Sequence, residues 1–409
     1  MRRRVLIATI PLLAAVGALA VGAIILLALG ASPVEGYSAL LEGSVGSRDA
    51  LIDSALKAVP LLLVGAGICI SYRANVINIG GEGQMVSGAL LATMAALWTP
   101  DLPRIIHLPV VLVAGVIGGA CWGAIPGYLK ARFSVNEILS TVMLNIVAVQ
   151  IMNYALRGPL IDPAETERGT NIPQTERLPE STDLPILLGG TLLNLGVVIA
   201  VVAAIGAWFL LWRTTIGYRI RAVGLSREAA RYAGIPVQRS IVLALTLSGS
   251  LAGLAGALGV VGSQSHRFVT DGSAAGFTGS AGFNGIVTAL FGGLHPLWTI
   301  PSSFLFGGLQ VGANSMQRAV QVPSALITGL NGIVVLCVVG TNRYRRRLAA
   351  RTRIEEATSD ETTDPVAEVL AADEAPHHDG DHGPTDHDGA TGDSDHADDR
   401  DADEGANAR

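Results

Sequence analysis

The chain has 409 residues, of which 50% are hydrophobic and 15% charged, and its mean hydropathy is +0.46. These values exclude an ordinary soluble enzyme and indicate an all-α, polytopic membrane protein. The net charge of −6 is divided unevenly, because the segment from Glu355 onward carries −17, with 19 acidic residues and two arginines, so that the preceding residues carry +11.

Residue counts also exclude some chemistry. Only two lysines occur, Lys57 and Lys130, and alanine follows each, so the chain has no phosphate-binding GxxxxGK[ST] loop and is not itself a Walker-type ATPase. The three cysteines lie far apart in apolar runs, which predicts packing and neither a disulfide framework nor a metal site. We expect no enzymatic activity, no cofactor, no metal and no nucleic-acid partner.

The first apolar run covers residues 5–31 and follows three arginines. Its length of roughly 27 residues exceeds the hydrophobic region of a signal peptide, so an uncleaved first transmembrane helix is favoured over a cleaved leader. We assign residues 1–50 to this helix and an external segment.

Nine further apolar runs predict about ten transmembrane helices in all. They cover residues 55–70, 83–98, 108–129, 138–156, 186–212, 241–262, 281–293, 297–312 and 325–340. With the N-terminus inside, 18 lysines and arginines fall in inner connections and 8 in outer ones. The excess predicts that both termini are cytoplasmic.

A polar stretch interrupts the apolar pattern between residues 73 and 85. Asn75, Asn78, Glu82 and Gln84 lie here among three glycines. A carboxylate at membrane depth costs at least about 2.5 kcal/mol, so we expect Glu82 to face protein, water or ligand. The glycines predict a broken or re-entrant segment that lines a cavity.

A loose echo of this stretch opens the second half of the chain, at residues 282–286. Each motif begins a short span with several glycines, and the preceding spans are predicted to cross in opposite directions. The chain is therefore a candidate inverted repeat. In a chain with 49 glycines, chance similarity is the alternative.

A neutral, hydroxyl-rich solute needs amides along its path more than fixed charge. The candidates for lining or gating a path are Asn78, Glu82, Gln84, Asn136, Glu137, Asn145 and Asn284. Hydrogen bonding between helices is the structural alternative for each. For Glu82 and Glu137 the alternative is a scaffold role with Arg73 or Arg132.

The connection between residues 212 and 241 predicts a short helix over residues 227–233. Ser226 is its N-cap, Glu228 favours the first turn, Gly234 supplies a left-handed stop and Pro236 prevents continuation. Such a helix needs something to pack against. The expected docking surface consists of Leu225, Ala229, Ala230, Tyr232, Ala233 and Ile235. An amphipathic loop lying on anionic headgroups is the alternative.

This loop resembles the EAAxxxG core of the coupling helix in permeases of ABC importers. Other segments resemble the nucleoside and simple-sugar branch of the same family: Asn78 to Gln84, Lys130 to Asn145, Gly158-Pro-Leu, Trp212 to Gly224, Gly282 to Leu290 and His295-Pro-Leu. The resemblance runs from about residue 51 to residue 340, and we assign residues 51–345 to the permease.

The resemblance implies a permease in the plasma (inner) membrane of a prokaryote, working by alternating access. Its implied partners are a separate ABC ATPase, a second homologous permease, an extracellular lipoprotein or periplasmic-type binding protein, membrane lipid, and a nucleoside or sugar as substrate. Ser226, Arg227, Glu228, Ala229, Ala230 and Gly234 would couple it to the ATPase. The nucleoside subtype fits better than the ribose subtype.

Two rival functions remain open. A proton-coupled secondary transporter would use Glu82 and Glu137 for coupling, and a membrane anchor would transport nothing. Residues 355–409 are Asp-, Glu- and His-rich, with few large apolar residues, and are predicted to form a disordered cytoplasmic tail. Its histidines would permit weak binding of divalent metals, with a solvated polyanion as the alternative.

Overall fold

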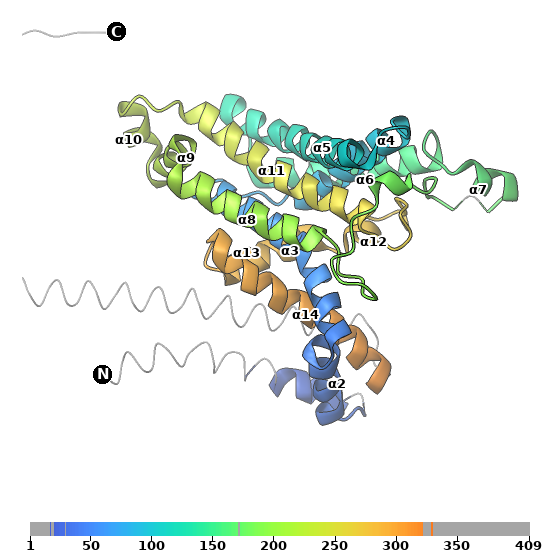
Figure 1. Cartoon of the computed structure of the whole chain (residues 1–409). Coiled ribbons are helices and arrows are strands. Elements are labelled where there is room, and N and C mark those ends of the chain that lie inside the picture. Colours follow the sequence, from blue (N-terminus) through green and yellow to red (C-terminus); the bar gives the residue numbers. More distant parts are fainter. Residues whose placement is uncertain (1–16, 18–19, 29, 171, 322–328, 330–409) are drawn as a thin grey trace, which may run out of the picture. The chain divides into compact units, whose positions relative to one another are not determined.

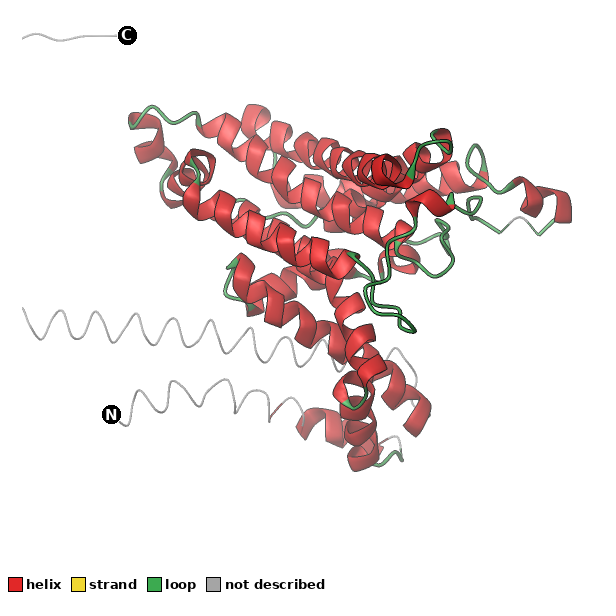
Figure 2. Ribbon diagram, in the orientation of Figure 1, coloured by secondary structure: helices red, strands yellow, loops and turns green. Residues whose placement is uncertain are grey.

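The structure is a computed structural model that describes residues 17, 20–28, 30–170, 172–321 and 329. The described residues form helices joined by loops, with two isolated β-bridges and no strand among them (Figure 2). The helices are α2 (Pro33–Val45), α3 (Arg48–Arg73), α4 (Gly81–Trp98), α5 (Arg104–Phe133), α6 (Glu137–Arg157), α7 (Pro163–Arg168), η1 (Glu180–Thr182), α8 (Gly196–Arg213), α9 (Thr215–Leu225), α10 (Arg227–Tyr232), α11 (Val237–Val261), α12 (Ala274–Thr278), α13 (Ala281–Phe291) and α14 (Pro296–Val320).

Five of these helices are long and apolar enough to cross a membrane, namely α3, α5, α6, α8 and α11. A sixth candidate is the bent pair formed by Ala20–Ala28 and α2. The predicted all-α, polytopic membrane class is thereby confirmed. Two of the ten predicted runs, 5–31 and 325–340, lie largely outside the described residues, so the total number of spans stays a prediction.

Most predicted runs coincide with observed helices, and α8 and α2 are the exceptions. Helix α8 begins ten residues later than the predicted run, because Ile186 and Asn194 pair in an antiparallel bridge and the Asn194 side chain accepts a hydrogen bond from Gly196 N at 3.0 Å. Helix α2 was not expected. Its signals were in the sequence, since Ser32 caps the helix and Pro33 occupies its first turn.

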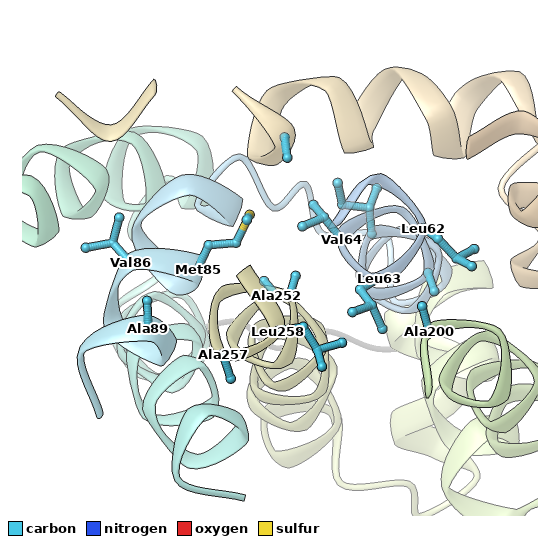
Figure 3. Close-up of a cluster of buried hydrophobic side chains, with 14 of the residues drawn as sticks. Leu62, Leu63, Val64, Met85, Val86, Ala89, Ala200, Ala252, Ala257 and Leu258 are labelled. Atoms are coloured by element: carbon cyan, nitrogen blue, oxygen red, sulfur yellow. The ribbon is translucent and has the colours of Figure 1, made fainter. Parts of the chain in front are cut away.

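Helices α3 and α11 form the centre of the fold. In α3, 78% of the most apolar 18-residue window is buried, and in α11 67%. Figure 3 shows α11 between α4 and α3, with Ala252 and Leu258 of α11 among Met85, Leu62 and Leu63. The apolar windows of both helices are therefore mostly enclosed by neighbouring helices.

Glycines allow α5 and α11 to pack at close backbone distance. Gly115 and Gly119 are four residues apart on α5, as are Gly249 and Gly253 on α11. A Cβ built on Gly119 would lie 2.2 Å from the carbonyl oxygen of Gly249, and one on Gly253 would lie 2.3 Å from that of Gly115. Small residues at this spacing are what membrane helices use to approach each other.

The helix bundle has two distinguishable ends (Figure 1). One end carries α9 and α10, and is called the α10 end below. The other carries α7 and the loop that joins it to α8, and is called the α7 end.

Candidate functional site

The predicted interruption of the helix is present. Helix α3 ends at Arg73, and the chain returns to the interior through residues 74–80 before α4 begins at Gly81. Asn75 adopts a left-handed conformation with φ of 54°, which turns the chain back. The segment 74–80 is therefore re-entrant, held between α3 and α4.

A network of side-chain amides fixes this re-entrant segment. Asn78 Nδ2 donates to Gln84 Oε1 at 3.0 Å and to the Ser248 hydroxyl of α11 at 2.9 Å. Asn145 of α6 accepts a hydrogen bond from Gly83 N at 2.9 Å and donates to the carbonyl of Ile79 at 3.0 Å. All three amide side chains are buried. Their contacts are hydrogen bonds within the protein, which is the alternative to lining a substrate path.

Glu82 links α4 to α13. Its side chain is 2% exposed, accepts a hydrogen bond from the Thr278 hydroxyl, and accepts another from Phe283 N at 3.3 Å. Phe283 is the third residue of α13, and Ser280 provides no side-chain cap for that helix. Glu82 thus acts as the N-terminal cap of α13 from another helix.

The N-termini of α4 and α13 meet at this point. A Cβ built on Gly282 would lie 2.3 Å from Glu82 N, and one on Gly81 would lie 3.1 Å from the Cα of Gly282. Side chains larger than hydrogen cannot fit at Gly282 without displacing backbone. We call this meeting point the helix junction.

From the helix junction, α13 and α4 lead to different partners at their far ends. Helix α13 leads to Leu294, whose carbonyl oxygen accepts a hydrogen bond from Arg73 at 3.2 Å. Helix α4 leads to Trp98 and then to Arg104, which bonds to the carbonyl of Asp183 at 2.7 Å. The inverted repeat expected from the sequence echo stays a prediction.

The other three predicted path residues make no contact with Glu82 among the described hydrogen bonds and ion pairs. Asn136 caps α6 through a hydrogen bond from Ile138 N at 2.9 Å, and Glu137 pairs with Lys130 at 2.7 Å. Asn284 is half-buried in the first turn of α13. The predicted scaffold partners were wrong, because Glu137 pairs with Lys130 in place of Arg132 and Glu82 binds Thr278 in place of Arg73.

Two adjoining cavities open at the α7 end, with volumes of about 520 and 370 Å³. They share Lys57 and Asn194 in their walls, and the smaller one reaches Thr278. None of the seven predicted path residues lines either cavity. No sequence pattern predicts that Lys57 and Asn194 lie together, since they are far apart in the chain and in different elements.

The predicted short helix is present as α10. Ser226 accepts a hydrogen bond from Ala229 N at 3.2 Å, and Gly234 is left-handed with φ of 74°. Leu225 and Tyr232 are 90% and 94% exposed, as a docking surface requires. The inclusion of Ala230 in that surface was wrong, because this side chain is 3% exposed and packs inward against the chain's own core.

Contacts between α10 and the re-entrant segment were missed by sequence reasoning. Arg227 of α10 donates to the carbonyl of Asn75 at 3.4 Å. Beside it, α9 packs against the end of α3, where a Cβ on Gly224 would lie 1.9 Å from the carbonyl oxygen of Arg73. A cavity of about 530 Å³ at this place is lined by Asn75, Glu137 and Arg227, among others. The sequence could not predict the hydrogen bond from Arg227, because its acceptor is a backbone carbonyl 152 residues away and every residue has such a carbonyl.

The fold and these sites define the protein as a polytopic, α-helical membrane protein with interrupted spans and an exposed helix on one end. Residues 50–339 match the family described as the permease component of the branched-chain amino acid transport system. The chain belongs to this family of membrane permeases.

Several curated proteins are similar over most of the chain. The guanosine ABC transporter permease protein NupP of Bacillus subtilis is 36% identical, over 82% of this chain and 94% of its own length. The glucose ABC transporter permease protein TsgB13 of Haloferax volcanii is 33% identical, over 86% and 93%. The nucleoside ABC transporter permease protein NupB of Lactococcus lactis is 32% identical, over 75% and 84%.

Proposed function

We propose that this chain is the permease subunit of an ABC importer for nucleosides or simple sugars, and that separate ATPase subunits drive it. The observation that carries the proposal is the similarity to NupP, NupB and TsgB13 over most of each chain. Two of these three relatives are named for nucleosides or guanosine, which favours a nucleoside.

The α10 helix supports an ATPase partner at its end of the bundle. A helix of six residues is marginal by itself in water. Its exposed Tyr232 and the neighbouring Leu225 present apolar surface that a partner would cover. We place this end in the cytoplasm, with both chain termini, in the plasma membrane of a prokaryote, and the binding protein at the α7 end.

Helix α6 supports a second permease as partner. Only 22% of its most apolar window is buried within this chain. Gln150 lies exposed on this helix, where lipid would leave its amide without a hydrogen-bonding partner. We assign the exposed face of α6 to the contact with the second permease, with Gln150 facing a shared substrate path.

The contacts described above supply a route for alternating access. ATP-driven movement of α10 would act on residues 74–80 through Arg227. It would act on the end of α3 through the adjoining helix α9, whose Gly224 packs against Arg73. The re-entrant segment is bonded to α6 and α11 by Asn145 and Ser248. A displacement at α10 would therefore reach the helix junction through packed and hydrogen-bonded groups.

The test is uptake by vesicles that contain this full-length chain, its ATPase, its second permease and its binding protein. We expect ATP-dependent uptake of a labelled nucleoside, competed by unlabelled nucleosides. The double variant Glu228→Ala and Gly234→Ala should retain membrane insertion and ATP hydrolysis but lose most uptake. Uptake by this chain alone under a proton gradient would favour the secondary transporter, and no uptake in either format would favour the membrane anchor.

A further inference from the structure

We propose a binding site for the headgroup of an anionic phospholipid around Trp212, where α3, α8 and α9 come together beside the start of α14. The site does not depend on which solute is transported. It consists of Arg73, Trp212, Arg221 and His295, called the Trp212 cluster below.

The Trp212 cluster concentrates positive charge without a counter-ion. The guanidinium carbons of Arg73 and Arg221 lie 5.2 and 5.8 Å from the centroid of the Trp212 ring, and the His295 ring centroid lies 4.7 Å from it. Among the described residues, no ion pair joins either guanidinium to a carboxylate. Two cations on one ring repel each other, and the ring's quadrupole attracts each only weakly.

Buried hydrogen-bonding atoms in the same cluster lack partners. Arg73 Nε, Arg221 Nε and His295 Nδ1 are each buried with no hydrogen-bond partner. Arg73 uses one terminal nitrogen on the Leu294 carbonyl. The two arginines and His295 are half-buried, so part of each residue is open to a phosphate group. Phosphate oxygens are the acceptors that the guanidinium fork fits best.

An apolar stripe on α8 leads directly to this cluster. Val198, Val202, Ile205 and Phe209 are exposed, and Trp212 continues the same spacing of four and three residues. The 18 residues of α8 span about 27 Å, close to the thickness of the hydrocarbon layer. An acyl chain on this stripe would bring its phosphate to Arg73 and Arg221.

The local charge favours an anionic lipid over a zwitterionic one. Residues 213–239 contain six arginines and one acidic residue, Glu228. A phosphatidylglycerol headgroup carries net negative charge, whereas phosphatidylcholine brings a cation with its phosphate. Basic pockets between membrane helices on the cytoplasmic side are the type of site that takes anionic headgroups.

The test compares two charge-removing variants on α9 in the full-length chain, purified in mild detergent. Arg221→Gln removes a member of the Trp212 cluster, and Arg219→Gln removes an exposed arginine two residues away. We expect phosphatidylglycerol to raise the Tm of the unaltered chain and of Arg219→Gln, with phosphatidylcholine much less effective. Arg221→Gln should bind phosphatidylglycerol about tenfold more weakly, measured by the Tm shift and by lipid retained in native mass spectrometry.

Three outcomes would overturn the proposal. If Arg219→Gln and Arg221→Gln weaken phosphatidylglycerol binding equally, the lipid is attracted by the overall positive charge and not by a specific site. Inorganic phosphate as effective as phosphatidylglycerol would assign the site to a free anion. Equal stabilisation of all forms by both lipids would remove the headgroup preference. If Arg221→Gln does not fold, Arg221→Lys serves instead, because lysine keeps the positive charge but lacks the planar guanidinium group. We expect Arg221→Lys to bind phosphatidylglycerol detectably but more weakly than Arg219→Gln does.

Discussion

Glu82 joins two helices that meet at their N-termini. Its buried carboxylate accepts hydrogen bonds from the Thr278 hydroxyl and from Phe283 N, and the second of these caps α13. The N-terminus of α13 is therefore stabilised by a residue of α4. A role for Glu82 in the substrate path stays a prediction.

The capping role makes a prediction about stability. Glu82→Ala should lower the free energy of unfolding by about 1–3 kcal/mol, because α13 loses its cap and the Thr278 hydroxyl loses its acceptor. Glu82→Gln should cost less, since its amide oxygen can still accept from Phe283 N. Thermal unfolding in detergent would measure both. A larger loss with glutamine than with alanine would contradict the cap.

Asp162 offers a pH-dependent prediction outside the membrane. The Arg267 guanidinium beside Asp162 lowers the pKa of that carboxyl below its usual value of 3.8. The ion pair therefore stabilises the connection after α6 at any pH above the usual value, and this contribution is lost as the pH falls through the lowered pKa. The stability gap between the unaltered chain and Asp162→Asn should thus be constant from pH 8 to 5 and shrink below pH 3.8.

Limited proteolysis of the connection between α6 and α8 at several pH values would measure this gap. Glu167→Gln, an exposed carboxylate on α7, is the matched control and should be cleaved like the unaltered chain throughout. A gap that widens on acidification would have the wrong sign for a lowered pKa.

At the scale of elements, local signals were sufficient where the structure is local. The cap, first turn and left-handed end of α10 were all predicted from Ser226, Glu228 and Gly234. The burial of Ala230 on α10 was not predicted, because it depends on which other elements pack against this six-residue helix. The re-entrant break was predicted since its glycines and amides are consecutive, whereas its contact with α10 joins distant residues.

The helix junction predicts a contrast between two helical glycines. Gly282→Ala would place a Cβ 2.3 Å from Glu82 N, so α4 and α13 must separate, whereas Gly206 of α8 has no atom within 4 Å of the added Cβ. We expect Gly282→Ala to lower Tm markedly and to reduce uptake. Gly206→Ala should leave Tm unchanged or raise it, because alanine favours a helix by about 1 kcal/mol over glycine. Equal Tm values for the two variants would mean that the junction tolerates a side chain.

At the scale of the whole molecule, exposed apolar surface is found at Tyr232 of α10 and over most of α6. Composition and the motif set were enough to place the chain among membrane permeases. They could not show that α3 and α11 are enclosed while α6 is not, since all three are apolar runs of similar length. Which helix faces a partner follows from packing: glycines let α5 and α11 approach closely, whereas only 22% of the most apolar window of α6 is buried.

The assembly with an ATPase makes the last prediction, and neighbouring alanines on α10 provide its control. A photo-reactive amino acid at Ala229, which is exposed, should cross-link to a nucleotide-hydrolysing subunit in membranes, and so should one at Tyr232. The same group at Ala230 points into this chain's own core and should give cross-links within the chain only. Comparable intermolecular yields from Ala229 and Ala230 would indicate non-specific capture. If neither Ala229 nor Tyr232 gives cross-links to such a subunit while the chain remains inserted, α10 is not the contact with the ATPase. The hydrogen bond from Arg227 to Asn75 would then not connect an ATPase to the re-entrant segment.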